Sequence, residues 1–151
     1  GLVGMTLLYD DIEAELIADG IHTSHKAMQL LLKFKRDKLT LITDGIRAKG
    51  LPGGTYDLGG QEVHVKEGVA RLKDGTLAGS TLTLNQAFKN IMNLGEDLVQ
   101  TSRMLSYHPA KTLNVDHELG QIKSGYLADF VLMAPDLSIQ KVAVEGQIKN
   151  T

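Results

Sequence analysis

The chain has 151 residues, of which 42% are apolar and 23% are charged, and its formal net charge is −2 at pH 7. These values are typical of a globular domain that can bury a sizeable core. No segment concentrates lysine and arginine, and no apolar run approaches the roughly 18–20 residues that span a bilayer. We therefore expect neither nucleic acid nor a membrane as a partner. The absence of cysteine excludes disulfides and thiol chemistry, and it fits a reducing, cytoplasmic compartment.

The first third of the chain predicts a strand, a helix and a second strand. An apolar run at 14–19 is followed by residues 24–37, whose apolar positions recur at helical spacing, and then by the apolar run 39–43. Ser24 is a plausible N-cap, and Lys33, Lys35 and Arg36 read as a solvated helix end. The predicted buried face of the helix consists of Ala27, Leu30, Leu31 and Phe34. The two strands should be parallel and covered on both faces.

After residue 51 the sequence pattern changes from strand–helix–strand to short hairpins, helices and a strand-rich tail. Paired glycines and alternating valines at about 51–72 predict an antiparallel meander of short hairpins. Helical spacing returns at 84–94 and 96–105, and the tail predicts two strands at 130–133 and 139–144. Two parallel strands cannot close a barrel, which needs about eight. Because the opening residues are also apolar, we expect the chain to be part of a larger protein.

Polar residues follow both parallel strands at the point where each strand ends. Asp19-Gly20-Ile21-His22 follows the first strand, and Asp44-Gly45 follows the second. If the strands are neighbours, these groups emerge at the same rim, where α/β proteins place their sites. A carboxylate and an imidazole there could move protons and polarise a carbonyl. From spacing alone, the alternative interpretation as turn and capping residues stays open.

Several segments carry a family resemblance. The motifs "ELIADGIHTS", "LTLITDG" and "KDGTLAGSTLTL", in this order and spacing, resemble the N-acetylglucosamine-6-phosphate deacetylases of the amidohydrolase superfamily. The opening "GLVGM" is similar to that family's segment after a barrel strand, and the tail "LGQIKSGYLADFVLM" resembles a segment found across the superfamily. The resemblance covers essentially the whole chain.

The resemblance implies an α/β fold: the C-terminal part of a (β/α)8 metal-dependent-hydrolase barrel with strands of a small β-sandwich domain. Residues 1–111 would belong to the barrel, with the β-hairpin insert at about 51–72, and residues 112–151 to the β-sandwich. The full-length parent would hydrolyse the acetamide of N-acetylglucosamine 6-phosphate, a small-molecule substrate, to glucosamine 6-phosphate and acetate. It is also expected to be a homo-oligomer.

The resemblance further implies roles for individual residues. Asp44 matches the catalytic acid/base, and His22 matches the group that engages the substrate carbonyl. The remaining substrate-binding positions are Asp19, Gly20 and Ile21 before His22, and Leu77, Ala78 and Gly79 in the "LAGS" loop. The parent would need a divalent metal ion, zinc or similar, whose main ligands lie upstream of this chain. We expect no metal ligand among the residues present, and therefore no activity of the chain alone.

The other histidines read as structural. His64 alternates with valines and should face solvent, and His108 and His117 should be surface residues. His22 and His25 could share one helical turn, but they straddle the predicted N-cap, which disfavours a metal pair. Two further hypotheses stay open: another amidohydrolase of the dihydroorotase or hydantoinase kind, or a non-catalytic sugar-binding or structural chain.

Overall fold

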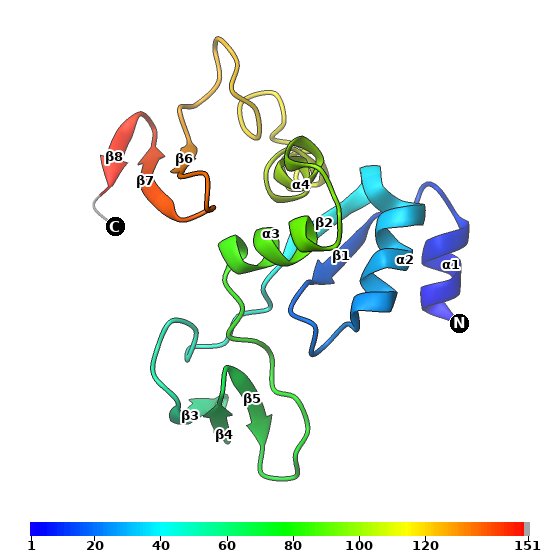
Figure 1. The fold of residues 1–151 in the computed structure, drawn as a ribbon, viewed down its shortest axis with the longest axis vertical. Helices are drawn as coiled ribbons and strands as arrows, with labels where there is room; N and C mark the ends of the chain where they lie inside the picture. The colour runs from blue at the N-terminus through cyan, green and yellow to red at the C-terminus, as the bar shows by residue number, and fades with distance from the viewer. Residues whose placement is uncertain (150–151) are drawn as a thin grey trace.

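The computed structural model describes residues 1–149, which form three groups of elements along the chain (Figure 1). The N-terminal group contains α1 (Leu2–Leu8), β1 (Ala14–Ile17), α2 (His25–Lys35), the 3₁₀ turn η1 (Arg36–Lys38) and β2 (Leu39–Ile42). The middle group contains β3 (Gly54–Leu58), β4 (Gln61–Lys66) and β5 (Val69–Leu72). Then follow α3 (Leu84–Asn93), α4 (Leu98–Leu105), α5 (Tyr107–Thr112), β6 (Phe130–Met133), β7 (Ile139–Val144) and β8 (Gln147–Lys149). No helix among the described residues is long and apolar enough to cross a membrane.

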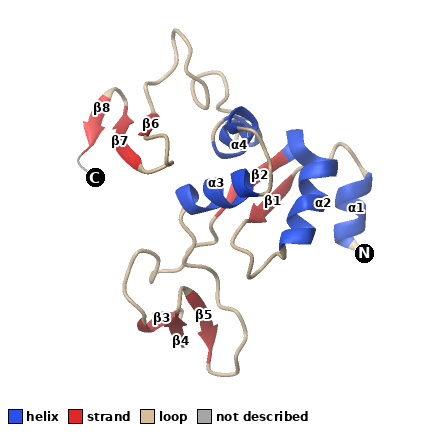
Figure 2. Ribbon diagram, in the orientation of Figure 1, coloured by secondary structure: helices blue, strands red, loops and turns tan. Residues whose placement is uncertain are grey.

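The predicted strand–helix–strand unit is confirmed. Strands β1 and β2 pair in parallel, with Leu16 opposite Leu41 in the register. Helices α2, α3 and α4 pack around this pair (Figure 2). The core between them consists of Leu16, Ala18, Met28, Leu39, Leu41, Leu82, Ala87, Ile91 and Met104. Burial alternates along β2, where Thr40 and Ile42 are half-buried, so coverage of both faces is not observed within residues 1–149.

Helix α2 begins where the sequence predicts, but it buries a different face. The Ser24 hydroxyl accepts a hydrogen bond from the backbone N–H of Ala27 at 3.3 Å, which confirms the N-cap. Met28 and Lys35 are buried, whereas the predicted core residue Phe34 is 52% exposed. Two residue sets have the same helical spacing: the predicted set and Met28, Leu31, Leu32 and Lys35. The second set was not predicted as the buried face because it contains the charged residue Lys35. Its burial depends on hydrogen bonds from the ammonium group to residues far away in the sequence.

The meander at 54–72 is antiparallel, in the order β3-β4-β5, as predicted. Val63 and Val65 are buried, and His64 between them is exposed and hydrogen-bonded to Thr55. The core of this unit also contains Ala48, Ala70 and Ala78. The segment that follows β2 and the segment that precedes α3 therefore pack against the same hairpins. This arrangement determines the position of both segments relative to each other.

The C-terminal strands β6 and β7 have the predicted bounds and pair in antiparallel fashion. Strand β8, which the sequence reading missed, extends the same sheet. The Asp129 carboxylate accepts a hydrogen bond from the backbone N–H of Glu145 at 2.6 Å, which links the residue before β6 to the residue after β7. This sheet lies away from the β1–β2 pair (Figure 1).

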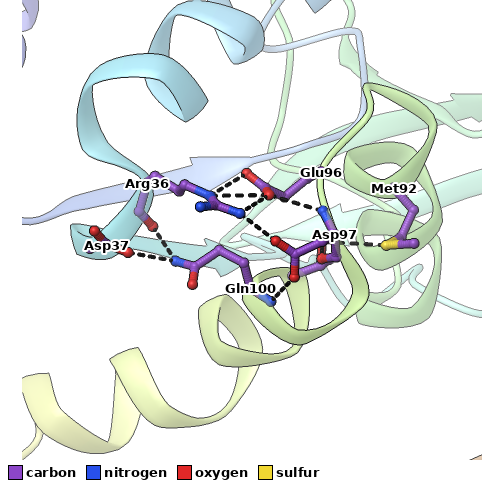
Figure 3. A network of polar contacts seen from close by, with 7 residues as sticks. Arg36, Asp37, Met92, Glu96, Asp97 and Gln100 are labelled. Carbon is purple, nitrogen blue, oxygen red and sulfur yellow. Dashed lines mark hydrogen bonds and ion pairs between the residues drawn. The ribbon is translucent and has the colours of Figure 1, made fainter.

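Several cations and polar groups are paired at the amino-terminal end of β1 and β2. Arg36 forms ion pairs with Glu96 and Asp97, and the side chain of Gln100 donates to the carbonyl of Arg36 at 2.9 Å (Figure 3). Lys35 is 3% exposed, and its ammonium group donates to the carbonyl of Tyr9 at 2.8 Å. The prediction of a solvated basic helix end was therefore wrong for Lys35, whereas Arg36 is exposed as predicted, although it is ion-paired.

Candidate active site

Asp44 lies two residues beyond β2, where the chain leaves the sheet. Its φ is +46°, a left-handed conformation that costs free energy for a residue other than glycine. The residue is exposed, and its carboxylate has no hydrogen-bond or ion-pair partner within residues 1–149. Strained backbone held by its surroundings is typical of functional positions. The free carboxylate at this rim is therefore the leading candidate for proton transfer.

The loop that contains Gly79 lies against the Asp44 backbone. The N–H of Ser80 donates to the carbonyl of Asp44 at 2.9 Å, and the N–H of Ile46 donates back to the carbonyl of Ser80 at 3.0 Å. The Ser80 hydroxyl donates to the carbonyl of Thr43 and accepts from the N–H of Leu82. Ser80 is buried, so these bonds are shielded from water. Ser80 was not predicted as a site residue, although it lies in the "LAGS" loop.

Gly79 leaves no room for a side chain beside Asp44. Its φ is +61°, and a Cβ placed on it would lie 2.6 Å from Cγ2 of Ile46 and 3.0 Å from the carbonyl oxygen of Asp44. Both the conformation and the space therefore require glycine. Of the other two predicted loop residues, Ala78 is buried in the hairpin core and Leu77 is half-buried. Gly79 also lies beside the Asp44 side chain, since the same Cβ would lie 3.6 Å from Oδ2.

The turn that follows β1 holds His22 through Asp19. Asp19 Oδ1 accepts hydrogen bonds from the N–H groups of Ile21 and His22, at 2.8 and 2.9 Å. Asp19 Oδ2 lies 2.6 Å from Nδ1 of His22. The Asp19 side chain is 8% exposed and that of His22 is 20% exposed. Because β1 and β2 are adjacent and parallel, His22 and Asp44 lie at the same end of the sheet.

Electrostatics at this turn favour an ionised carboxylate. Partial burial raises the pKa of Asp19. The hydrogen bonds from the His22 ring and from two backbone amides together lower the pKa by more than burial raises it, so the pKa lies below its usual range. Gly20 makes the turn possible with a φ of +79°. A Cβ on Gly20 would lie 3.3 Å from Cε1 of His25, which shows how closely the next helix approaches. Ile21 is exposed at the tip of the turn.

A cleft of about 430 Å³ opens beside Asp44. This volume is in the range of small-molecule sites. Its lining combines the segment after β2, Gly79 and the tip of the β3–β4 hairpin: Asp44, Gly45, Ile46, Arg47, Asp57, Leu58, Gly59 and Gly79. Arg47 and Asp57 were not predicted as site residues. Arg47 could have been suspected because it follows Asp44 by three positions, but the approach of the hairpin tip has no local sequence signal.

The described residues contain no cluster of potential metal ligands. No three His, Asp or Glu side chains within residues 1–149 lie close enough to act as joint ligands. His22 Nδ1 is already bonded to Asp19. His64 and His117 are exposed, as predicted, but His108 is 8% exposed and its Nδ1 lies 2.7 Å from the carbonyl oxygen of Leu39. The prediction of a surface His108 was wrong, because α5 packs on β2 and pairs this ring with a strand carbonyl.

A model of the amidohydrolase family matches residues 8–149. The chain belongs to the amidohydrolase family. Over 99% of its length it is 43% identical to the N-acetylglucosamine-6-phosphate deacetylase of Lysinibacillus sphaericus, of which it covers 39%. It is 40% identical to a putative N-acetylgalactosamine-6-phosphate deacetylase of Escherichia coli K12, of which it covers 90%. The crystal structure of N-acetylglucosamine-6-phosphate deacetylase from Pasteurella multocida superimposes with a TM-score of 0.95 at 35% identity.

These findings confirm the resemblance on which the sequence-based prediction rested. The superposition covers 100% of this chain and 40% of the Pasteurella enzyme. The chain therefore spans about two fifths of that amidohydrolase, and a similar share of the Lysinibacillus protein. The Escherichia coli K12 relative, by contrast, is only slightly longer than this amidohydrolase segment.

Proposed function

We propose that the parent protein is a deacetylase that hydrolyses the acetamide of N-acetylglucosamine 6-phosphate to glucosamine 6-phosphate and acetate. The observation that carries the proposal is the free carboxylate of Asp44 at the carboxyl end of β2, beside a cleft and against Gly79. The names of relatives at up to 43% identity support the substrate class. In this proposal the chain supplies the acid/base and the substrate histidine, and it is inactive alone.

Asp44 would serve both proton transfers of the reaction. It would first remove a proton from a water molecule as the water oxygen forms a bond to the acetamide carbon. The C–N bond would then break, and Asp44 would deliver the proton to the departing sugar nitrogen, because an amine leaves poorly unless it is protonated. The Asp44 carboxylate has no competing partner among the described residues, so it is suited to both steps.

His22 would engage the acetamide carbonyl as its carbon becomes tetrahedral. Asp19, Gly20 and Ile21 would border the sugar through the turn that they form with His22. Leu77, Ala78 and Gly79 would line the other side of the substrate, where the missing side chain of Gly79 allows close backbone approach. Because Ala78 is buried, it would act through its backbone.

The parent protein would supply what the described residues lack. We propose that a divalent metal ion, zinc or similar, is held mainly by ligands outside this chain. In the same proposal, residues 1–111 contribute to a (β/α)8 barrel that includes the hairpin insert, and residues 112–151 contribute to a small β-sandwich. The two-stranded parallel pair with helices packed on it fits a segment of such a barrel. We also propose that the parent is a homo-oligomer.

N-acetylgalactosamine 6-phosphate is a second candidate substrate. The observation that favours it is the 40% identity to the putative N-acetylgalactosamine-6-phosphate deacetylase, which is close to the 43% found for the Lysinibacillus protein. The two sugars differ in the configuration of one hydroxyl group, so the same acid/base chemistry serves both. Identity alone does not separate them.

The decisive experiment measures acetate release by the parent protein from both sugar phosphates, and ring opening of dihydroorotate and a hydantoin as comparison substrates. We expect hydrolysis of an acetylated amino-sugar phosphate and no hydrolysis of the cyclic amides. The Asp44→Asn variant should bind substrate normally but turn it over about 10²–10⁴-fold more slowly, on the order expected for loss of a general acid/base. Asp74→Asn, in an exposed turn, is the matched control and should be fully active.

Four results would contradict the proposal. Hydrolysis of cyclic amides alone would favour a different amidohydrolase, and sugar binding without turnover by the parent would favour a non-catalytic chain. An active Asp44→Asn variant would remove Asp44 from its proposed role. Acetate release by the 151-residue chain alone would overturn the claim that the chain is inactive by itself.

A further inference from the structure

Both oxygens of the Asp19 carboxylate have hydrogen-bond partners within the turn that Asp19 starts. Oδ1 accepts two backbone hydrogen bonds, from Ile21 and His22, so this oxygen fixes the orientation of the carboxylate plane. Oδ2 then faces Nδ1 of His22 at 2.6 Å. The base of the turn is also held, because the side chain of Asn90 on α3 donates to the carbonyl of Ala18 at 2.7 Å. The 2.6 Å contact therefore follows from a rigid backbone frame.

An ionised carboxylate can only accept hydrogen bonds, so the partner atom on His22 must carry a proton. A neutral imidazole has one N–H group and one lone pair, and the partner of one ring nitrogen determines which tautomer forms. We infer that Asp19 is a positioning residue that holds the His22 proton on Nδ1 and leaves Nε2 as the ring nitrogen that meets the substrate. Asp19 then acts on the reaction through His22.

The fixed tautomer determines what His22 can offer a ligand. Neutral His22 presents the Nε2 lone pair, which accepts a hydrogen bond from a sugar hydroxyl. Protonated His22 presents Nε2–H, which donates to a carbonyl or phosphate oxygen. Engagement of the acetamide carbonyl, as proposed above, therefore requires the protonated ring. This consequence rests on the proposed function, whereas the tautomer itself rests only on the geometry of the turn.

Nitrogen NMR of the imidazole rings tests the tautomer directly. The 151-residue chain is labelled with ¹⁵N-histidine, and His22→Gln identifies the His22 signals among the five histidines. At a pH where the ring is neutral, we expect Nδ1 to have the shift of a protonated nitrogen and Nε2 that of an unprotonated one. The opposite assignment in the unmodified chain would overturn the inference, whatever the variants do.

Asp19→Asn provides a reversal test. The amide oxygen of asparagine can keep the two backbone bonds, while its NH₂ group faces Nδ1 as a donor. The ring should respond by moving its proton to Nε2, so the two nitrogen signals exchange character. Asp74→Asn is the matched control, because Asp74 accepts the N–H of Thr76 at 2.9 Å in a similar turn without a histidine. Unchanged His22 signals in Asp19→Asn would contradict the inference.

The same variant separates this inference from the proposed function. If the parent protein does not hydrolyse acetylated amino-sugar phosphates, neutral His22 should still carry its ring proton on Nδ1. If it does, Asp19→Asn should change the pH profile of kcat, whereas a purely structural role would lower the amount of folded enzyme and leave the profile of the remainder unchanged. An unaltered profile together with a reversed tautomer would show that His22 does not act in the chemical step.

Discussion

The two ends of the β1–β2 pair differ in how their polar groups are satisfied. At the amino-terminal end, Lys35, Arg36, Gln100 and His108 all find partners within the chain. At the carboxyl end, the carboxylate of Asp44 has no partner among the described residues, and Asp44 has a positive φ. One end uses its polar groups for stability, and the other leaves a carboxylate available for a ligand.

This difference explains why burial alone would misplace the site. Lys35 is the most buried titratable residue within residues 1–149, and it lies at the end that the structure closes with hydrogen bonds. Stabilising contacts at one end allow an unpaired, strained residue at the other, since natural proteins tolerate a local cost at functional positions. Substitutions at the two ends should therefore affect activity and stability separately.

Asp44→Gly should separate activity from stability most clearly. In the parent protein the variant should lose at least as much turnover as Asp44→Asn, about 10²-fold or more. In the 151-residue chain it should raise the free energy of unfolding by up to about 1 kcal/mol, because glycine adopts positive φ without strain. Kinetics and chemical denaturation measure the two quantities. A less stable glycine variant would show that the Asp44 side chain contributes structural contacts after all.

Gly79→Ala should disturb both properties together. The new Cβ would meet Ile46 and the Asp44 carbonyl, so we expect a loss of about 2–4 kcal/mol of stability from overpacking and backbone strain. Gly59→Ala is the matched control for stability, since Gly59 has a φ of +60° and a Cβ placed on it would meet nothing within 4 Å. Its cost should be about 1 kcal/mol, from the backbone alone. Equal losses in both variants would contradict the close approach of Gly79 to Asp44.

Local signals made much of the fold predictable. Helix α2 has its serine cap, α3 ends before Gly95, and β6 and β7 begin and end at predicted residues because apolar runs meet turn residues there. Asp44 and His22 could be proposed from the strand-end rule and from the family resemblance. These features depend on neighbours within a few positions.

The errors concern contacts between residues far apart in sequence. The sequence around Lys35 predicts a solvated side chain, but the fold places the carbonyl of Tyr9 beside it. The sequence around His108 predicts an exposed ring, but α5 packs on β2 and pairs the ring with a strand carbonyl. Helix α1 was missed because its seven residues have no side-chain cap. Ser80 joins the loop before α3 to the end of β2, a bond that no local pattern indicates. Positions that depend on tertiary partners override their local propensity.

Lys35→Met tests the closed end of the sheet. Methionine keeps most of the buried stem but removes the ammonium group, so the carbonyl of Tyr9 loses its donor. We expect a loss of about 1–3 kcal/mol, the contribution typical of a hydrogen bond from a charged donor. Lys33→Met, on the exposed side of the same helix, should change stability by less than about 0.5 kcal/mol. Turnover of the folded parent should be unchanged in both variants. Reduced turnover in Lys35→Met would mean that the two ends are coupled.

The stability contributed by Asp19 should depend on pH in a defined direction. Burial raises the pKa of Asp19, but the hydrogen bonds from His22 and two amides lower it below the usual value of about 3.9. A carboxyl group whose pKa is lower in the folded state stabilises the fold above its unfolded pKa and loses this contribution as the pH falls through its folded pKa. The difference in unfolding free energy between the unmodified chain and Asp19→Asn should therefore be largest near neutral pH and shrink below about pH 4. A difference that grows in acid would contradict this sign.

Arg36→Gln should have the smallest effect, although Arg36 has the most ion-pair contacts in Figure 3. Its side chain is 45% exposed, so water and salt weaken its attraction to Glu96 and Asp97. We expect a small decrease in Tm at low salt that largely disappears at about 1 M salt, where the Debye length is about 3 Å. Arg47→Gln is the control, because Arg47 is exposed and forms no ion pair within residues 1–149. A decrease in Tm that does not depend on salt would show that Arg36 stabilises the fold through the hydrogen-bond geometry around Gln100 and not through its charge. The closed end would then be held by neutral contacts, and its ion pairs would matter little beside the buried bonds of Lys35 and His108.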